Sequence, residues 1–125
     1  MIAGLLDQVR VLYIKRSFDD ALMVLDCYAE KNELTSEMLI WKGRLIQLAE
    51  PGKYELEDAK KCFLKALEHD ADNVKAMLEL GWLAFGVFDD VIEARGYFNR
   101  ALAAADGLHQ EAIGALEKCE STDLH

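Results

Sequence analysis

The chain has 125 residues, of which 52% are hydrophobic and 30% are charged, so it can bury one core and leaves little room for a second domain. Its 14 basic and 23 acidic residues give a formal net charge of −9, which disfavours sequence-independent binding to the phosphates of nucleic acid. Three scattered cysteines without a CxxC spacing, Cys27, Cys62 and Cys119, indicate a reducing compartment rather than a disulfide framework.

Apolar residues recur every three or four positions and turn signals are few, which predicts a chain built only of helices. The first helix is expected over 2–15, where Asp7 and Arg10 come too early for the apolar region of a signal peptide. No apolar stretch approaches the roughly 18 residues of a membrane-spanning helix. We therefore expect a cytoplasmic protein that contacts no membrane.

Capping residues divide the rest of the chain into further helices. Ser17 and Asp20 have the spacing of a capping box, and Thr35 or Ser36 can cap the helix that follows. Asp106 followed by Gly107 predicts a helix end, which brings the total to about seven helices in an all-α protein. After the first, the predicted helices span 18–31, 36–49, 55–69, 74–87, 89–105 and 108–120.

A pattern of small and large residues repeats along the chain. Ala59-x-x-x-Phe63-x-x-Ala66-Leu67 recurs as Ala94-x-x-x-Phe98-x-x-Ala101-Leu102, and more faintly from Ala21 to Ala29. A glycine precedes each strong copy on the helix before it, Gly43 and Gly81. We expect these glycines to let two helices approach closely, and the aromatic residue to fill the seam between one helix pair and the next.

At these residues the sequence resembles the tetratricopeptide repeat family, whose units pair two antiparallel helices; the best match is Leu80-Gly81 with Ala94, Phe98 and Ala101. The resemblance implies a right-handed superhelical stack of helix pairs, an α-solenoid. It implies one domain over 1–125, with repeats over about 2–33, 35–70 and 73–106 and a capping helix over 108–120.

The helix over 74–87 is apolar nearly all round, so either its neighbours cover it completely or part of it is exposed. The family register implies a concave groove that binds a protein or peptide segment, as an adaptor or chaperone does. Aromatic and arginine side chains, which are common at binding hot spots, occur in it. The predicted groove residues are Arg10, Tyr13, Ile40, Arg44, Gln47, Lys75, Leu78, Trp82 and Phe85, with Met77, Leu80 and Ala84 packing inward.

Acidic residues gather where second helices begin, and a stack would bring them to one edge. Acidic residues stabilise helix N-termini whatever the function, but a net charge of −9 would also attract a basic partner. One alternative function is therefore a small acidic inhibitor, such as an immunity protein that neutralises a basic toxin or enzyme. A further alternative is a self-associating structural protein, a homodimer through the N-terminal helix. The acidic edge comprises Asp19, Asp20, Glu57, Asp58, Asp89 and Asp90.

Residues suited to catalysis are sparse. His69, His109 and His125 have no second histidine or cysteine at ligand spacing, and the glycines form no phosphate-binding loop. Cys62 is expected to be a partly buried small hydrophobe rather than a nucleophile, and the other two cysteines are interpreted in the same way. The sequence predicts a protein that is not an enzyme and has no metal site or cofactor.

Overall fold

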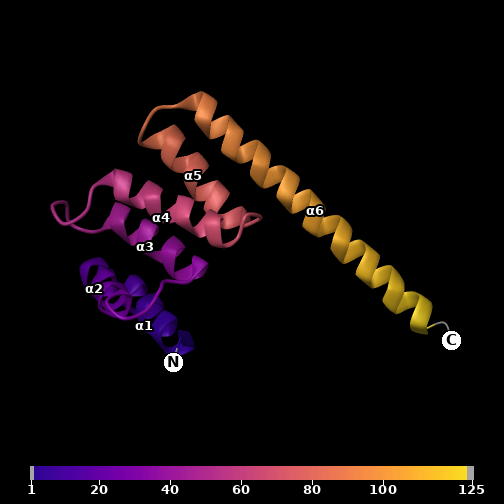
Figure 1. Ribbon diagram of the computed structural model, residues 1–125, viewed down its shortest axis with the longest axis horizontal. Helices are drawn as coiled ribbons and strands as arrows, with labels where there is room; N and C mark the ends of the chain where they lie inside the picture. The colour runs from indigo at the N-terminus through magenta and orange to yellow at the C-terminus, as the bar shows by residue number, and fades with distance from the viewer. Residues whose placement is uncertain (1, 124–125) are drawn as a thin grey trace. The chain divides into compact units, whose positions relative to one another are not determined.

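The computed structural model describes the backbone of residues 2–123 and the side chains of residues 4–118. Within that range the chain has helices and no strand, which confirms the all-α prediction. Figure 1 shows the helices in chain order. They are α1 Ile2–Ile14, α2 Phe18–Ala29, α3 Ser36–Leu48, α4 Leu56–His69, α5 Val74–Gly86 and α6 Val91–Asp123.

The chain forms two compact units, Met1–Ala71 with α1 to α4, here called unit 1, and Asp72–His125 with α5 and α6, called unit 2. In unit 1, α1 packs against α2, α2 against α3, and α3 against α4. In unit 2, α5 packs against α6. The superhelical stack, the single domain and the repeat boundaries stay predictions.

Side chains cap the N-termini of several helices. Thr35 Oγ1 accepts a hydrogen bond of 3.2 Å from the Met38 amide at the start of α3, one of the two predicted caps. Asn73 caps α5 in the same way by accepting from the Ala76 amide at 3.1 Å. The capping box predicted from Ser17 is wrong, because the Ser17 side chain makes no capping hydrogen bond. Its backbone, at φ −90° and ψ 65°, departs from the extended conformation that usually directs a capping oxygen at the first amides.

The predicted break at Asp106-Gly107 is also wrong, because α6 runs through both residues. The segment over 108–120, predicted to be a separate capping helix, lies within this one long helix, so the described residues contain six helices rather than about seven. A glycine ends a helix when it adopts a positive φ. Among the described glycines only Gly52 does so, at 131°. The preceding Ala103–Ala105 run favours helix and offsets the weak propensity of Gly107.

Two glycines set the distance between neighbouring helices. A Cβ atom added to Gly43 on α3 would lie 2.5 Å from Cε1 of Phe63 on α4. In unit 2, a Cβ atom on Gly81 of α5 would lie 2.4 Å from Cε1 of Phe98 on α6. The close approach expected at these glycines is therefore confirmed. Each aromatic ring fills the seam within its own helix pair, however, and not one between pairs, because the missing side chain opens the gap there.

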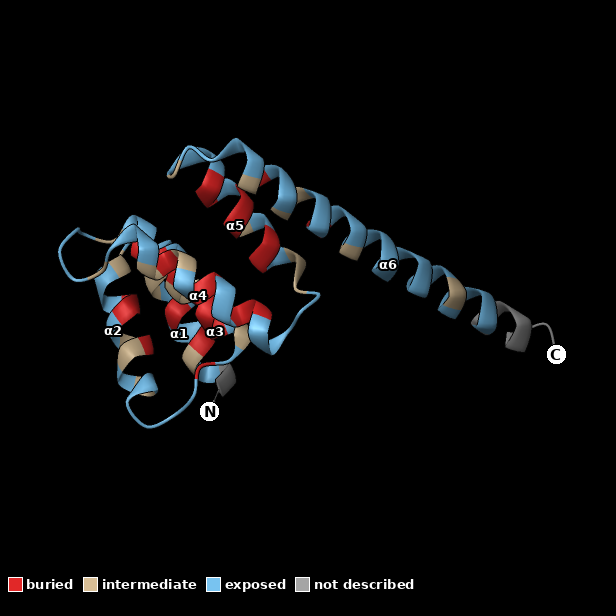
Figure 2. Ribbon diagram, turned by 45° about the horizontal axis from the view of Figure 1, so that its top comes forward, coloured by how far each residue is buried: buried red, intermediate tan, exposed pale blue. Residues whose placement is uncertain are grey.

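Buried residues lie on the facing sides of helices within each unit (Figure 2). In unit 1 the fully buried side chains include Val9, Leu25 and Phe63, and in unit 2 they include Leu80 and Leu83. From Leu102 to Lys118 no side chain of α6 is buried. The second half of α6 thus extends beyond the part of the helix that α5 covers.

Candidate functional site

One side of α5 carries large apolar side chains that are open to solvent. Leu78, Trp82 and Phe85 are 39%, 62% and 53% exposed, and Lys75 is exposed as well. Their spacing of three and four residues places these four residues, called the α5 face, on one side of the helix. Met77, Leu80 and Ala84 are buried, as the register predicts. The alternative that neighbouring helices cover all of α5 does not hold in unit 2.

Contacts with neighbouring rings orient the exposed indole of Trp82. Its ring centroid lies 5.1 Å from that of Phe98 on α6, with an interplanar angle of 67°. It lies 6.3 Å from that of Phe85, in a T-shaped arrangement at 86°. Because the Phe98 ring rests on Gly81, the glycine that brings α5 and α6 together also places the ring that supports Trp82. The Trp82 indole is therefore oriented before any partner binds.

In unit 1 the predicted groove residues of α1 and α3 meet through side-chain contacts. Arg10 on α1 lies 3.1 Å from Glu37 on α3. Tyr13 on α1 packs edge-on against Trp41 on α3, with centroids 5.3 Å apart. The Arg44 guanidinium lies 5.9 Å from the centre of the Trp41 ring. These contacts form a mixed aromatic and basic surface, which we call the α1–α3 surface.

The other two predicted groove residues of unit 1 differ in their exposure to solvent. Gln47 is exposed, and its Nε2 donates a hydrogen bond of 3.3 Å to the Gly43 carbonyl. Ile40 is only 6% exposed, so its assignment to a binding surface is wrong. Because α3 packs against both α2 and α4, more of its circumference is covered than the sequence pattern indicates.

The acidic residues lie at or near the helix starts predicted for them, and some of them have a structural role there. Asp58 accepts a hydrogen bond of 2.8 Å from the Glu55 amide at the start of α4. Asp90 accepts one of 3.0 Å from the Glu93 amide at the start of α6. Each carboxylate thereby satisfies an amide that the helix leaves without a backbone partner. The remaining acidic residues of the predicted edge are exposed, namely Asp19, Asp20, Glu57 and Asp89.

The structure also contains a polar cluster that the sequence did not predict, centred on Asp26 of α2. The Tyr54 hydroxyl donates a hydrogen bond of 2.7 Å to Asp26 Oδ2. The ammonium groups of Lys42 and Lys53 lie 3.1 Å from Asp26 Oδ1 and Oδ2. They also lie 4.9 Å and 5.7 Å from the centre of the Tyr54 ring. The members come from α2, α3 and the loop before α4, so no spacing in the sequence relates them.

In this Asp26 cluster two lysine ammonium groups share one carboxylate. Burial by itself would raise the pKa of Asp26, but the hydrogen bonds from Tyr54, Lys53 and Lys42 outweigh it and lower that pKa below its ordinary value. Burial would likewise lower the pKa of Lys42, yet its bond to Asp26 raises it. Both groups therefore stay charged at neutral pH. Three donors already occupy the Asp26 carboxylate, so it is suited to joining helices rather than to proton transfer.

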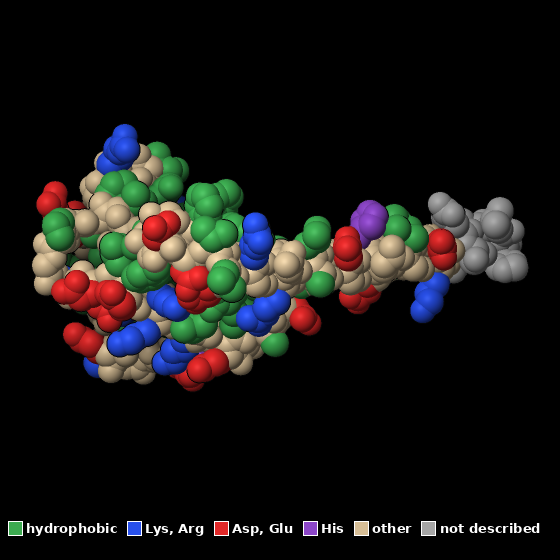
Figure 3. All heavy atoms as spheres, turned by 90° about the horizontal axis from the view of Figure 1, so that it is seen from above, with side chains coloured by type: hydrophobic (Ala, Val, Ile, Leu, Met, Phe, Trp, Pro, Cys, Tyr) green, Lys and Arg blue, Asp and Glu red, His purple; other side chains and the backbone are tan. Residues whose placement is uncertain are grey.

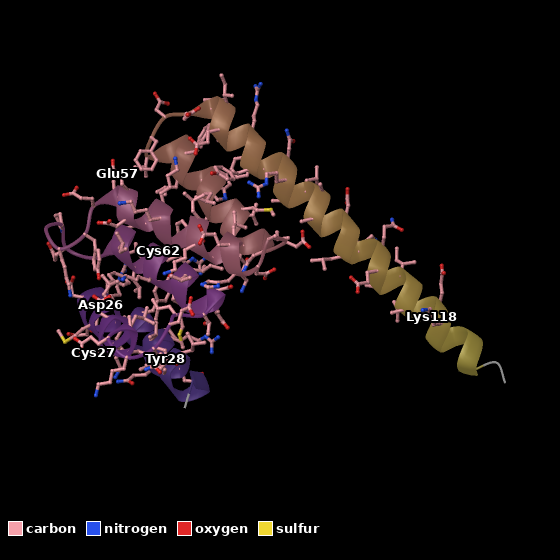
Figure 4. All side chains as sticks on the ribbon, in the orientation of Figure 1. Asp26, Cys27, Tyr28, Glu57, Cys62 and Lys118 are labelled. Atoms are coloured by element: carbon pink, nitrogen blue, oxygen red, sulfur yellow. The ribbon has the colours of Figure 1, made fainter. Side chains whose placement is uncertain are left out.

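The cysteines differ in their surroundings. Cys62 on α4 is buried, and this burial raises the pKa of its thiol, which agrees with the predicted small hydrophobe. Cys27 on α2 is exposed, so the same interpretation is wrong for it, because the buried side of α2 is formed by Ala21, Leu22 and Leu25. Figure 4 shows Cys27 at the periphery of unit 1 and Cys62 among its helices. Cys119 lies outside the described side chains.

Among the described residues, no three histidine, cysteine, aspartate or glutamate side chains are grouped so that they could hold a metal ion. Within the same part of the chain, no helix combines the length and apolar character needed to cross a membrane. No protein-family model matches the sequence, and no curated protein matches it significantly. The α5 face and the α1–α3 surface are therefore judged on their own geometry.

Proposed function

We propose that the chain is a non-catalytic binding module for a protein or peptide segment, with an adaptor or chaperone-like role. The observation that carries this proposal is the exposure of Trp82 and Phe85 side by side on α5. Exposed aromatic side chains lose contact with water when a partner covers them, and tryptophan is among the residues that contribute most at interfaces. Because Phe98 already orients Trp82, little side-chain freedom is lost on binding.

The α1–α3 surface is the binding surface that we propose within unit 1. Tyr13 offers an aromatic side chain, and the exposed guanidinium group of Arg44 can form further hydrogen bonds to carboxylates or backbone carbonyls. The guanidinium group of Arg10 lies 3.1 Å from both Asp7 and Glu37, so a partner's carboxylate would compete with these two pairs. Arg44 stacks near Trp41, which limits the orientations of its guanidinium group. A segment with acidic groups therefore fits the α1–α3 surface of unit 1, and a segment with apolar anchors fits the α5 face of unit 2.

The repeated glycine–phenylalanine contact supports the tetratricopeptide-like architecture that the proposal assumes. Gly43 with Phe63 and Gly81 with Phe98 make the same kind of contact in two successive helix pairs. Successive pairs with equivalent seams are the building plan of a helical solenoid.

The test begins with affinity capture from the native cell lysate and identification of the captured protein, followed by titration of that purified protein with variants. Trp82→Ala is expected to weaken binding roughly tenfold to a hundredfold. Its matched control is Ile92→Ala, which truncates a side chain of unit 2 that is 86% exposed and lies outside the α5 face. Arg44→Glu, with Arg95→Glu as control, tests the α1–α3 surface. Equal affinity of Trp82→Ala and Ile92→Ala would contradict the proposal.

The acidic edge favours a second candidate function, that of an inhibitor of a basic toxin or enzyme. Asp19, Asp20 and Glu57 are exposed and accompany a net charge of −9. An interface built on them would associate more slowly as salt rises, because salt screens charges in contact with solvent. A captured partner that salt releases and that Trp82→Ala retains would favour this function over the groove.

A hollow beside α1 supports the third candidate, self-association through the N-terminal helix. It encloses about 640 Å³ and is lined mainly by apolar side chains, including Leu5, Leu12, Met23 and Val24 of α1 and α2. Met23→Glu places a charge in the hollow and is expected to shift a homodimer to monomer in light scattering. A wild-type mass that equals one chain at every concentration would exclude this candidate.

A further inference from the structure

A second hollow in unit 1 lies beside the Asp26 cluster, between the end of α2 and helices α3 and α4. Its volume is about 290 Å³, and its lining includes Asn32, Lys42, Lys61, Cys62 and Lys65. Sites for small molecules typically have volumes of about 300–1,000 Å³. The hollow is therefore of a size that suits a small ligand rather than a peptide side chain with its backbone.

The lining of this hollow is positively charged although the chain as a whole is acidic. Lys61 and Lys65 are both exposed and lie four residues apart, so they share one side of α4, where like charges repel. In the part of the chain that the structure describes, neither takes part in an ion pair. Two ammonium groups that take part in no ion pair among the described residues thus line one hollow.

The other charged groups near the hollow have partners. The ammonium group of Lys42 lies 3.1 Å from the Asp26 carboxylate, which it shares with Lys53. Among the described lining residues the only carboxylate is that of Glu33, and one of its oxygens lies 3.5 Å from Nε2 of His69. Neither acidic group is therefore placed to compensate both Lys61 and Lys65.

The neutral side chains of the lining do not compensate the positive charges of Lys61 and Lys65 either. Cys62 lies between the two lysines in the sequence and is buried, and burial raises the pKa of its thiol, so it carries no negative charge at neutral pH. Figure 4 shows its place within unit 1. Each lysine ammonium offers three N–H donors and no acceptor. The lining contains three lysines and one glutamate, so the hollow presents lysine N–H donors and an excess of positive charge to whatever enters it.

We propose that this hollow binds a small phosphate-bearing anion, held between Lys61 and Lys65. A phosphate group has several acceptor oxygens and, near neutral pH, close to two negative charges, so one group can accept from both ammonium groups. Binding would also remove the repulsion between the two lysines. A singly charged carboxylate could neutralise only one of them, which is why phosphate is favoured.

The test is a nuclear magnetic resonance titration of the full ¹⁵N-labelled chain with inorganic phosphate, at constant ionic strength balanced by sodium chloride. The expected result is a saturable shift of the amide signals of Asn32 and of residues 61–65. Sodium acetate in place of phosphate is expected to give weaker binding. A parallel titration with O-phosphoserine distinguishes a free phosphate ion from a phosphate ester, because only a site open at its mouth accommodates the ester.

The variant Lys61→Gln with Lys65→Gln is expected to reduce the affinity for phosphate at least tenfold, roughly the effect of losing one charge-assisted hydrogen bond. The matched control, Lys15→Gln with Arg95→Gln, removes the same charge from exposed positions outside the hollow and should retain wild-type affinity. Both lysines of the hollow are exposed, so a well-dispersed spectrum of the double variant is expected and shows that it is folded.

Three results would overturn the proposal. Shifts that grow linearly without saturation, or that sodium chloride reproduces, would show that no site exists. An unchanged affinity in the Lys61→Gln, Lys65→Gln variant would show that the anion binds elsewhere. An equal loss in the control variant would show that the chain responds only to its total charge. None of these results bears on the α5 face, so the proposed function is tested separately.

Discussion

Gly81 affects both the packing of α5 against α6 in unit 2 and the position of the proposed binding residue Trp82. A methyl group there would lie 2.4 Å from Phe98, whose ring supports Trp82. Gly81→Ala must therefore displace a packed ring, and we expect it to lower the free energy of unfolding by about 1–3 kcal/mol, as overpacking does. Urea unfolding followed by circular dichroism measures this change.

The matched control for Gly81→Ala is Gly114→Ala on α6. No heavy atom lies within 4 Å of a Cβ atom added at Gly114, so alanine there should stabilise the helix by about 0.5–1 kcal/mol through its better propensity. The two glycine replacements are thus expected to have opposite signs. If Gly81→Ala were also stabilising, the close contact between α5 and α6 would be disproved.

Asp26 gives a prediction for the pH dependence of stability. Its folded-state pKa is lowered, so its contribution is fully present above the ordinary aspartate pKa and is lost as the pH falls through the lowered value. We expect Asp26→Asn to reduce the free energy of unfolding by about 1–3 kcal/mol at pH 7, because Lys42 loses a charged partner. The difference from wild type should shrink below about pH 4, where Asp26 in the unfolded chain begins to take up a proton while the folded chain still resists protonation.

A suitable control for Asp26→Asn is Asp7→Asn. Asp7 pairs with Arg10 at 3.1 Å, but its side chain is largely exposed, and exposed pairs contribute little. We expect a change of less than about 0.5 kcal/mol at either pH. An Asp26→Asn variant that behaved like Asp7→Asn across this pH range would show that the cluster does not stabilise unit 1.

At the scale of elements, most helix positions could be predicted from local signals. The helices expected over 36–49 and 74–87 match Ser36–Leu48 and Val74–Gly86, because Thr35 and Asn73 act through bonds to amides within three residues. The continuity of α6 could not be predicted in this way. An aspartate followed by glycine is compatible with a helix end and with a helix interior, and only the backbone conformation distinguishes the two.

Gly107→Ala distinguishes these two conformations in solution. In the continuous helix the glycine is helical and open to solvent, so alanine should raise helicity and stabilise α6 by about 0.5–1 kcal/mol. If Gly107 ended a helix with positive φ, the same change would destabilise the chain, because alanine disfavours that conformation. Circular dichroism at 222 nm measures the change in helicity, and thermal unfolding shows whether the substitution stabilises or destabilises the chain.

At the scale of the whole molecule, the exposure of a candidate surface could be predicted where the spacing of residues along a helix determines it. The α5 face needed no more than the spacing of Leu78, Trp82 and Phe85 along α5. Ile40 was misplaced because its burial depends on two neighbouring helices at once. The Asp26 cluster joins residues that are far apart in the sequence. Lysine, aspartate and tyrosine are common residues, so no local sequence pattern predicts that these particular side chains will be in contact.

The net charge of −9 leads to a prediction for the complete chain. An excess of like charge destabilises a compact state by self-repulsion, and salt screens exposed charges more than partly buried ones such as those around Asp26. We therefore expect moderate sodium chloride to raise the free energy of unfolding at pH 7, on the order of 1 kcal/mol or less. Thermal unfolding at increasing sodium chloride concentration, with the pH held constant, measures how stability depends on salt.

A variant separates this global repulsion from specific ion binding. Glu30 and Glu68 are exposed and lie at the C-terminal ends of α2 and α4, where the helix dipole also disfavours negative charge. Glu30→Gln with Glu68→Gln should therefore stabilise unit 1 at low salt and reduce the gain from sodium chloride. If salt instead destabilised the wild-type chain, its attractive ion pairs, with the Asp26 cluster foremost, would outweigh the repulsion that the net charge implies.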